Sequence, residues 1–221
     1  MIKAVLFDLD GTLVNSIDDL ADSCNYALEK LGLPTHETEK FRYFVGNGIP
    51  DLMKRILPDD KRDTEIYDEI FEIFWERYSN HFVDKTCAYD GIKPLIAKLK
   101  EMGIKVAVIS NKAEFFTLQV VEKCLGDVFD RVYGKREGYL PKPDPKLTLE
   151  LLKDLGVDAS ECLLVGDSGM DMATSVNVGC KGVGVLWGFR TKDELLQNGA
   201  DYIVRNPNEI IGIIKEINNE I

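Results

Sequence analysis

The apolar residues of the chain recur with two different spacings, which divide it into two kinds of segment. From residue 16 to residue 81 they recur every three or four positions, which is typical of amphipathic helices. We expect helices over 16–31, 49–57 and 64–81, with Gly32 and Pro34 ending the first and a polar connection leading to the second. Nothing in the segment 14–84 predicts a strand.

Short apolar runs rich in β-branched residues lie on both sides of that helical segment. A first buried strand is expected at residues 5–7, and further strands are expected over 104–110, 131–133, 162–166, 181–186 and 202–204. Helical patterns separate them over 92–102, 114–124, 146–155, 171–177, 191–197 and 208–217. Because strands that alternate with helices form parallel sheets covered on both faces, the pattern predicts a doubly wound α/β fold.

The two patterns together predict an α/β core interrupted after its first strand. We expect the core to contain residues 1–14 and 85–221, and an inserted all-helical domain to contain residues 15–84, with linkers at 14–15 and 84–90. A chain of 221 residues is long enough for such a pair. Ligands of doubly wound sheets bind at the carboxyl ends of the strands, near the point where the strand order reverses. Functional residues are therefore expected at that edge.

The first strand ends in two carboxylates, Asp8 and Asp10, and Gly11 follows them directly. Side chains alternate along a strand, so the two carboxylates would share a face if extended geometry continued. Burying both in ionised form is costly unless a cation lies between them, which favours a metal site. An ordinary turn after a strand remains the alternative interpretation of this stretch alone.

Three other polar stretches are expected at the same edge of the sheet. The strand over 104–110 ends in Ser110 and Asn111, the strand over 162–166 is followed by Asp167 and Asp171, and a loop between them carries Lys142 between two prolines. Each alone has an ordinary explanation, such as a helix cap, a solvated loop charge or a turn residue. Because all of them are expected at or near the ends of neighbouring strands, one shared site explains them better than several unrelated roles.

Composition excludes several other classes of protein. The formal net charge of −11 disfavours a nucleic-acid partner, because binding of phosphate backbones needs clustered Lys and Arg. The five cysteines are odd in number and scattered, which argues against both a disulfide framework and a zinc site. No apolar run approaches the roughly 20 residues that span a bilayer, and the N-terminal residues do not resemble a secretory signal. We therefore expect a cytoplasmic protein without a membrane partner.

The polar stretches resemble the four motifs of the haloacid dehalogenase superfamily, in order and along the entire chain. They are Asp8-Leu9-Asp10-Gly11-Thr12, then Ser110, then Lys142, then Gly166-Asp167-Ser168 with Asp171. A helical insert between the first two motifs resembles the cap of that superfamily's first subclass. Within the superfamily, the stretch 45–53 of the insert, together with 187–189 and 199–203 of the expected core, is similar to the phosphoglycolate phosphatase group.

The resemblance implies a magnesium-dependent hydrolase of phosphomonoesters. Asp8 would attack phosphorus and form an aspartyl phosphate, and Asp10 would act as general acid and base. Mg²⁺ would be held by Asp8, the backbone carbonyl of Asp10 and Asp167. Asp171 would act nearby, either through a water molecule or as an orienting carboxylate.

The same resemblance implies a set of phosphate-binding groups. Ser110 and Lys142 would hold the oxygens of the transferring phosphoryl group, and Lys142 would also pair with Asp8. The backbone amide of Asn111 is a further candidate donor. The prolines on both sides of Lys142 restrict its loop and help to hold that charge in place.

Substrate selection is expected to lie in the inserted domain. Two glycines, Gly46 and Gly48, flank Asn47 and predict a tight turn that could reach the site when the cap closes over it. Lys54 and Arg55 follow on the next helix and are the nearest cationic candidates, with solvated surface charge as their alternative role.

The substrate class that agrees best with these features is a small phosphorylated acid such as 2-phosphoglycolate. A phosphotransferase of the β-phosphoglucomutase type shares the motifs and the cap class, and pyrophosphate is a further possible substrate. A phosphate-binding or partner-binding module without catalysis is the non-enzymatic alternative. The oligomeric state has no signature in the sequence.

Overall fold

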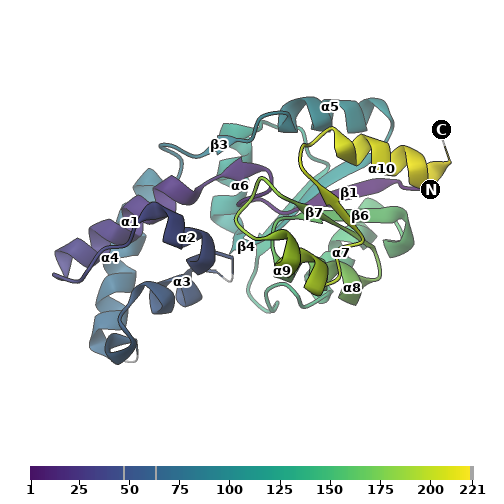
Figure 1. The fold of residues 1–221 in the computed structure, drawn as a ribbon. Coiled ribbons are helices and arrows are strands. Elements are labelled where there is room, and N and C mark those ends of the chain that lie inside the picture. Colours follow the sequence, from purple (N-terminus) through teal and green to yellow (C-terminus); the bar gives the residue numbers. More distant parts are fainter. Residues whose placement is uncertain (47, 63, 220–221) are drawn as a thin grey trace.

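A computed structural model describes residues 1–46, 48–62 and 64–219 of the chain (Figure 1). Its main sheet has six strands. In chain order they are β1 (Ala4–Phe7), β4 (Lys105–Ala113), β5 (Arg131–Lys135), β6 (Cys162–Gly166), β7 (Lys181–Val185) and β8 (Tyr202–Val204). Their spatial order is β5-β4-β1-β6-β7-β8, and all neighbouring pairs are parallel.

Helices cover both faces of this sheet, as expected for a doubly wound fold (Figure 1). On one face Val5 and Phe7 pack against α5 (Ile92–Glu101), α6 (Glu114–Cys124) and α10 (Glu209–Asn218). On the other face Ala4 and Leu6 pack against α7 (Lys146–Leu155), beside α8 (Gly169–Val178). A short helix, α9 (Lys192–Gln197), packs on α8 and β7. Side chains on both faces of the sheet are therefore buried. This explains why consecutive residues of the strands are apolar.

The strand order reverses at β1. The chain proceeds from β1 to β4 and β5 on one side, and then returns to β6, β7 and β8 on the other. The carboxyl ends of β4, β1 and β6 therefore lie next to one another at the reversal point, which is where open α/β sheets bind ligands.

Four helices form a separate bundle beside the sheet (Figure 1). They are α1 (Ile17–Lys30), α2 (Thr38–Phe44), α3 (Ile49–Ile56) and α4 (Glu65–His81), with a short 3₁₀ turn η1 (Asp59–Lys61) before α4. Helix α1 packs along α4, and their shared interior contains Leu20, Cys24, Phe74 and Tyr78. This bundle is the inserted segment of the chain.

Helix α2 corrects the expectation of a polar connection between the first two helices. It is only seven residues long, and Phe41 is its one buried residue, so no apolar stripe marks it in the sequence. The ring of Phe41 lies edge-on to those of His36 and Phe44, with centroids 6.2 and 5.5 Å apart. Tertiary packing of one aromatic side chain therefore stabilises a helix that periodicity does not indicate.

The two linkers pair with each other, although no strand was expected there. Strand β2 (Val14–Asn15) lies antiparallel to β3 (Cys87–Ala88), with Val14 opposite Ala88. Buried Asp19, in α1, accepts hydrogen bonds from the backbone amides of Lys85 and Thr86 at 3.0 and 2.8 Å. Strands of two residues are too short for an alternating pattern to reveal them.

Candidate active site

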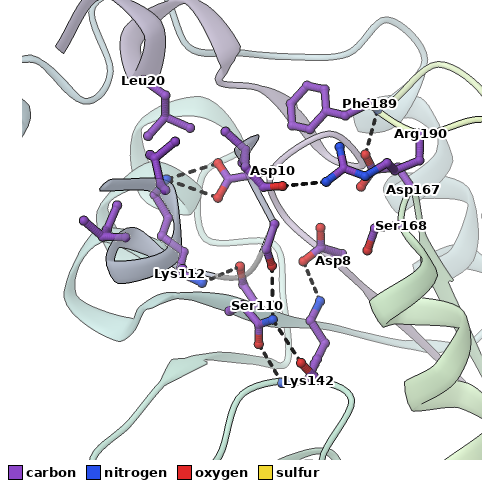
Figure 2. A pocket seen from close by; sticks show the side chains of 16 residues that line it. Asp8, Asp10, Leu20, Ser110, Lys112, Lys142, Asp167, Ser168, Phe189 and Arg190 are labelled. Atoms are coloured by element: carbon purple, nitrogen blue, oxygen red, sulfur yellow. Dashed lines mark hydrogen bonds and ion pairs between the residues drawn. The ribbon is translucent and has the colours of Figure 1, made fainter. Parts of the chain in front are cut away.

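Asp8 lies at the carboxyl end of the central strand of the sheet. It follows β1 directly, and its backbone amide donates to the carbonyl of Val165 in β6 at 2.9 Å. Ser110 belongs to the end of β4 on one side, and Asp167 follows β6 on the other. The parallel sheet therefore brings together residues that lie between 57 and 159 positions apart in the sequence, and all three border one cavity (Figure 2).

The ammonium group of Lys142 bridges two carboxylates at the wall of this cavity, and Figure 2 shows its contact with one of them, Asp8. Its Nζ lies 2.7 Å from Asp8 Oδ1 and 2.6 Å from Asp171 Oδ1, and it also donates to the carbonyl of Ile109 at 3.1 Å. Burial alone would lower the pKa of Lys142, but the charges of Asp171 and Asp8 outweigh it and raise that pKa above its ordinary value. A charged amine with three acceptors uses all its protons, so Lys142 holds Asp8 in one orientation.

Three buried carboxylates could surround a metal ion at this edge. One oxygen each of Asp8, Asp167 and Asp171 lies within 4.8 Å of the other two. Burial, and then the neighbouring acids, raise the pKa of Asp8 despite Lys142, and burial with the charge of Asp171 raises the pKa of Asp167 to about 7. A divalent cation would relieve this concentration of buried negative charge, and all-oxygen donors suit Mg²⁺ or Ca²⁺. The residues present therefore fit a hard divalent cation.

The three acids are not equally available to a cation. Both oxygens of Asp171 are engaged, because Oδ1 accepts from Lys142 and Oδ2 accepts from the amide and hydroxyl of Ser168 at 3.1 and 2.6 Å. Asp171 thereby caps α8 and orients Lys142. Asp8 and Asp167 line the cavity, whereas Asp171 does not, which favours the first two as ligands.

Two glycines enclose the side chain of Asp167. A Cβ atom on Gly11, which has φ +90°, would lie 2.3 Å from Asp167 Oδ2, and one on Gly188 would lie 2.2 Å from Asp167 Cβ. The backbone amide of Phe189 donates to Oδ2 at 2.8 Å, and the hydroxyl of Thr12 donates to Oδ1 at 3.2 Å. Only glycine fits at both positions, so the stretches around Gly11 and Gly188 hold this carboxylate in place.

The cavity lies between the sheet edge and the helical bundle. Its core side is polar, whereas the bundle contributes Leu20, Val45, Ile49 and Leu52. Its volume is about 60 Å³. That is space for on the order of four or five water molecules, so in this conformation the site admits only a small ligand.

Comparison with known proteins identifies the family. The sequence profile described as haloacid dehalogenase-like hydrolase matches residues 5–185. The chain belongs to the haloacid dehalogenase-like hydrolases. The hydrolase is 34% identical over 218 residues to a phosphoglycolate phosphatase of Chromobacterium violaceum, with 97% of each chain covered. It is 33% identical to one of Neisseria gonorrhoeae, covering 98% of this chain and 92% of the relative.

A solved structure gives the same result. A predicted phosphoglycolate phosphatase of Haemophilus somnus superposes on the hydrolase with a TM-score of 0.89 at 29% identity, covering 96% of this chain and 98% of the other. The expected superfamily and the expected doubly wound α/β fold are thus confirmed. The names of the relatives also agree with the expected class of enzyme, a phosphatase.

Sequence reasoning did not assign a role to Lys112, which the structure places against Asp10 (Figure 2). Its Nζ donates to both carboxylate oxygens of Asp10 at 3.1 Å, and Ser16 Oγ donates to Oδ1 at 2.6 Å. The same ammonium lies 5.3 Å from the ring centroid of Tyr78 in α4, where burial raises the pKa of the phenol to about 12. Asp10 is therefore held by donors from both the core and the start of the bundle.

The side chain of Asn111 makes three hydrogen bonds in the site, whereas the sequence indicated only its backbone amide, as a donor to phosphate. Its Oδ1 accepts from the amide of Lys142 at 2.7 Å, and its Nδ2 donates to the carbonyls of Lys142 and Gly46 at 3.3 and 3.2 Å. The side chain thus joins the Lys142 loop to Gly46 of the bundle. These contacts span 31 and 65 residues, so no local pattern could have indicated them.

The candidate residues of the bundle are separated in the structure. Gly46 and Gly48 border the cavity, and Asn47 lies outside the described residues. The guanidinium of Arg55 donates to the carbonyls of Tyr43 and Phe44 at the end of α2, at 3.3 and 2.9 Å. Neither Lys54 nor Arg55 is among the residues that line the cavity.

Proposed function

We propose that this hydrolase is a magnesium-dependent phosphomonoesterase that acts through an aspartyl phosphate on Asp8. The observation that carries the proposal is the fixed position of the Asp8 carboxylate, at the reversal point of the sheet, between Lys142 and the acid Asp167. A nucleophilic carboxylate needs a set orientation and a neighbouring cation that balances its charge, and Lys142 supplies both.

The first half of the reaction transfers the phosphoryl group to the protein. The free oxygen of Asp8 attacks phosphorus in line with the ester oxygen, and the bond between phosphorus and that oxygen breaks. Asp10 donates its proton to the leaving alkoxide. The hydroxyl of Ser110 holds the oxygens of the phosphoryl group, and the positive charge of Lys142 stabilises the negative charge that shifts across them.

The second half returns the protein to its starting state. Asp10, now ionised, removes a proton from a water molecule, and the resulting hydroxide attacks phosphorus. The bond to Asp8 breaks, inorganic phosphate forms, and Asp10 is protonated again for the next turnover. One carboxyl group thus serves as acid and then as base, so its position relative to Asp8 has to be preserved through both halves.

Asp8, Asp167 and the backbone carbonyl of Asp10 would hold the magnesium ion, and Asp171 would act indirectly by orienting Lys142. When bound, Mg²⁺ supplies charge that stabilises the transferring phosphoryl group. The raised pKa values of Asp8 and Asp167 support this assignment, because a cation favours their ionised forms.

A small phosphorylated acid, 2-phosphoglycolate, is the proposed substrate. Two observations support it: relatives that match almost the whole chain are named phosphoglycolate phosphatases, and the cavity of about 60 Å³ is small. We further propose that residues 15–84 act as a cap that closes over the substrate and excludes water. The bulk of a hexose phosphate argues against the mutase alternative in this conformation.

A small molecule in the cytoplasm is therefore the proposed partner. In the ranges that the structure describes, no helix combines the length and the apolar character needed to cross a membrane. The net charge of −11 gives no support for nucleic acid as a partner.

Release of inorganic phosphate tests the proposal. The protein is assayed with and without Mg²⁺ against 2-phosphoglycolate, pyrophosphate, hexose phosphates and an aryl phosphate. We expect magnesium-dependent release, with the highest kcat/KM for 2-phosphoglycolate. Transfer between positions of a hexose phosphate would favour the mutase alternative, and no release from any ester at any magnesium concentration would favour a silent binding module.

A further inference from the structure

The guanidinium group of Arg190 borders the cavity with one side unused. Arg190 lies in the loop between β7 and α9, and its side chain is only 10% exposed. Its Nη2 donates to the carbonyl of Val45 at 2.7 Å, and its Nε lies 3.4 Å from Glu194 Oε1. Its Nη1 is buried and has no hydrogen-bond partner among the described residues.

A buried guanidinium nitrogen without an acceptor is costly, because it has lost its hydrogen bonds to water and gained none in return. Such groups are normally paired, so an unpaired one at the wall of a cavity indicates that a ligand supplies the acceptor. The other two cations at the cavity are already engaged: Lys112 with Asp10, and Lys142 with Asp8 and Asp171. Within the described part of the chain, Arg190 is therefore the cavity cation that retains a donor for a ligand.

Arg190 lies across the site from Lys142, with Asp8 between them (Figure 2). A phosphoryl group at Asp8 and Lys142 would therefore direct the rest of its ester away from Lys142 and toward Arg190. Helix α3 also begins beside the cavity, because Gly48 is its N-terminal cap and Ile49 its first residue, and both line the cavity. The N-terminal end of a helix favours negative charge, which adds to the charge of Arg190.

We propose that Arg190 binds the carboxylate of the substrate and so selects small phosphorylated acids over neutral phosphate esters. This inference rests on the proposed function, because it assumes that the phosphoryl group is bound at Asp8. A carboxylate fits better than a second phosphate, since the cavity measures only about 60 Å³ and a single guanidinium nitrogen, Nη1, is without an acceptor among the described residues. Selectivity would thus come from the core loop after β7 as well as from the cap.

A purely structural role for Arg190 is the competing explanation. Through Val45, its side chain ties the core to the cap just before the glycine turn. Arg42, in α2, makes a second tie of the same kind, because its Nη1 donates to the carbonyl of Gly188 at 3.3 Å, yet Arg42 is not among the residues lining the cavity. The Arg42→Met variant therefore removes a tie between core and cap without removing a cavity cation, and it is the matched control.

The experiment compares two substrates that differ only in the group facing Arg190. They are 2-phosphoglycolate and 2-phosphoglycolamide, in which a neutral amide replaces the carboxylate. We expect the wild-type protein to prefer the carboxylate by about ten- to a hundredfold in kcat/KM, because a hydrogen bond to a charged group is lost with the amide. In Arg190→Met the ratio should fall to about one, whereas in Arg42→Met it should remain as in the wild type.

A measurement of binding tests the role of Arg190 in a protein that does not hydrolyse the ester. In an Asp8→Asn background with Mg²⁺, calorimetry compares the Kd of the two compounds, and Arg190→Met should weaken binding of 2-phosphoglycolate alone. Arg190→Lys, which retains the charge, should keep part of the preference, and circular dichroism checks that each variant is folded.

The outcomes separate this inference from the proposed function. Equal loss on both compounds in Arg190→Met, or no preference in the wild type, would overturn the role of Arg190 while leaving a phosphatase. If neither ester is hydrolysed, the proposed function fails, and the binding comparison in the Asp8→Asn background still decides whether Arg190 recognises the carboxylate.

Discussion

The ammonium of Lys112 lies 3.1 Å from both carboxylate oxygens of Asp10 and 5.3 Å from the ring centroid of Tyr78. Burial alone would lower the pKa of Lys112, but the charge of Asp10 and the contacts with Asp10 and Tyr78 together outweigh burial and raise that pKa. Lys112 is therefore a permanent cation between the proposed general acid and helix α4 of the bundle. It is a positioning residue, because it touches Asp10 and acts through it.

Replacing Lys112 with Met should lower kcat by about ten- to a hundredfold, because Asp10 then loses the contact that fixes its carboxylate. The loss should be large for alkyl phosphates, whose leaving group needs a proton, and small for p-nitrophenyl phosphate, whose leaving group does not. Steady-state kinetics on both esters measure this difference. Lys98→Met, at a solvent-exposed ion pair in α5, is the control. An equal loss on both esters would argue against positioning of Asp10.

Replacing Asp8 with Asn should lower turnover by about a thousandfold or more, because an amide is a poor nucleophile toward phosphorus. The fold should survive, since the amide has nearly the shape of the carboxylate and still accepts from Lys142. Phosphate release measures activity, and urea denaturation measures stability. Hydrolysis at the wild-type rate by a folded Asp8→Asn variant would exclude Asp8 as the nucleophile.

Magnesium should stabilise the protein more at pH 8 than at pH 6. The pKa of Asp167 is raised to about 7, above its unfolded value, so without metal the folded protein holds a proton that the unfolded chain has already lost. Without metal, the contribution of Asp167 to the free energy of unfolding therefore falls as the pH rises from about 4 to above 7. Binding of magnesium displaces that proton. The apparent affinity of the protein for Mg²⁺ should therefore weaken by up to about tenfold for each pH unit below 7. Thermal unfolding at fixed Mg²⁺ checks this, and a pH-independent increment in Tm would contradict it.

Replacing Asp19 with Ala should lower the free energy of unfolding by about 2–4 kcal/mol. Its buried carboxylate accepts from two backbone amides and from the hydroxyl of Thr86, and the substitution leaves these donors without their acceptor. Urea denaturation measures the change. Exposed Asp18, the preceding residue in α1, is the control, and Asp18→Ala should change stability by less than about 0.5 kcal/mol. Similar effects of the two substitutions would show that Asp19 does not anchor the linker.

The sheet was predictable because its physical cause is local. A strand buried on both faces needs a continuous apolar run, and such runs mark β1, β4 and β6 directly in the sequence. Parallel strands also place their following residues at one edge, which is why Asp8, Ser110 and Asp167 could be grouped before any coordinates. Helix α2 and the β2–β3 pair were missed because their stability comes from tertiary contacts rather than from a periodic pattern.

The sequence predicted only those residues of the site that belong to a recognisable motif. Lys112 and Asn111 stand beside Ser110 in the sequence, but their partners Asp10 and Gly46 are far along the chain, and only folding brings them together. Arg190 likewise follows Phe189 in a loop that packs against Asp167. The loop can approach this closely because Gly188 has no side chain. For Lys54 and Arg55 the sequence indicated a charge near the glycine turn, but it could not indicate that the guanidinium of Arg55 binds carbonyls at the end of α2.

The antiparallel pair of Val14 with Ala88 holds the two ends of the segment 16–86 side by side. For the core, this whole segment is then equivalent to a single turn between β2 and β3. The entropy of closing a loop grows slowly with its length, by about 0.6 kcal/mol for each doubling. A helical segment of different size could therefore be exchanged at this junction with little effect on the core, so the proposed cap, and with it the proposed specificity, can change while the core is retained.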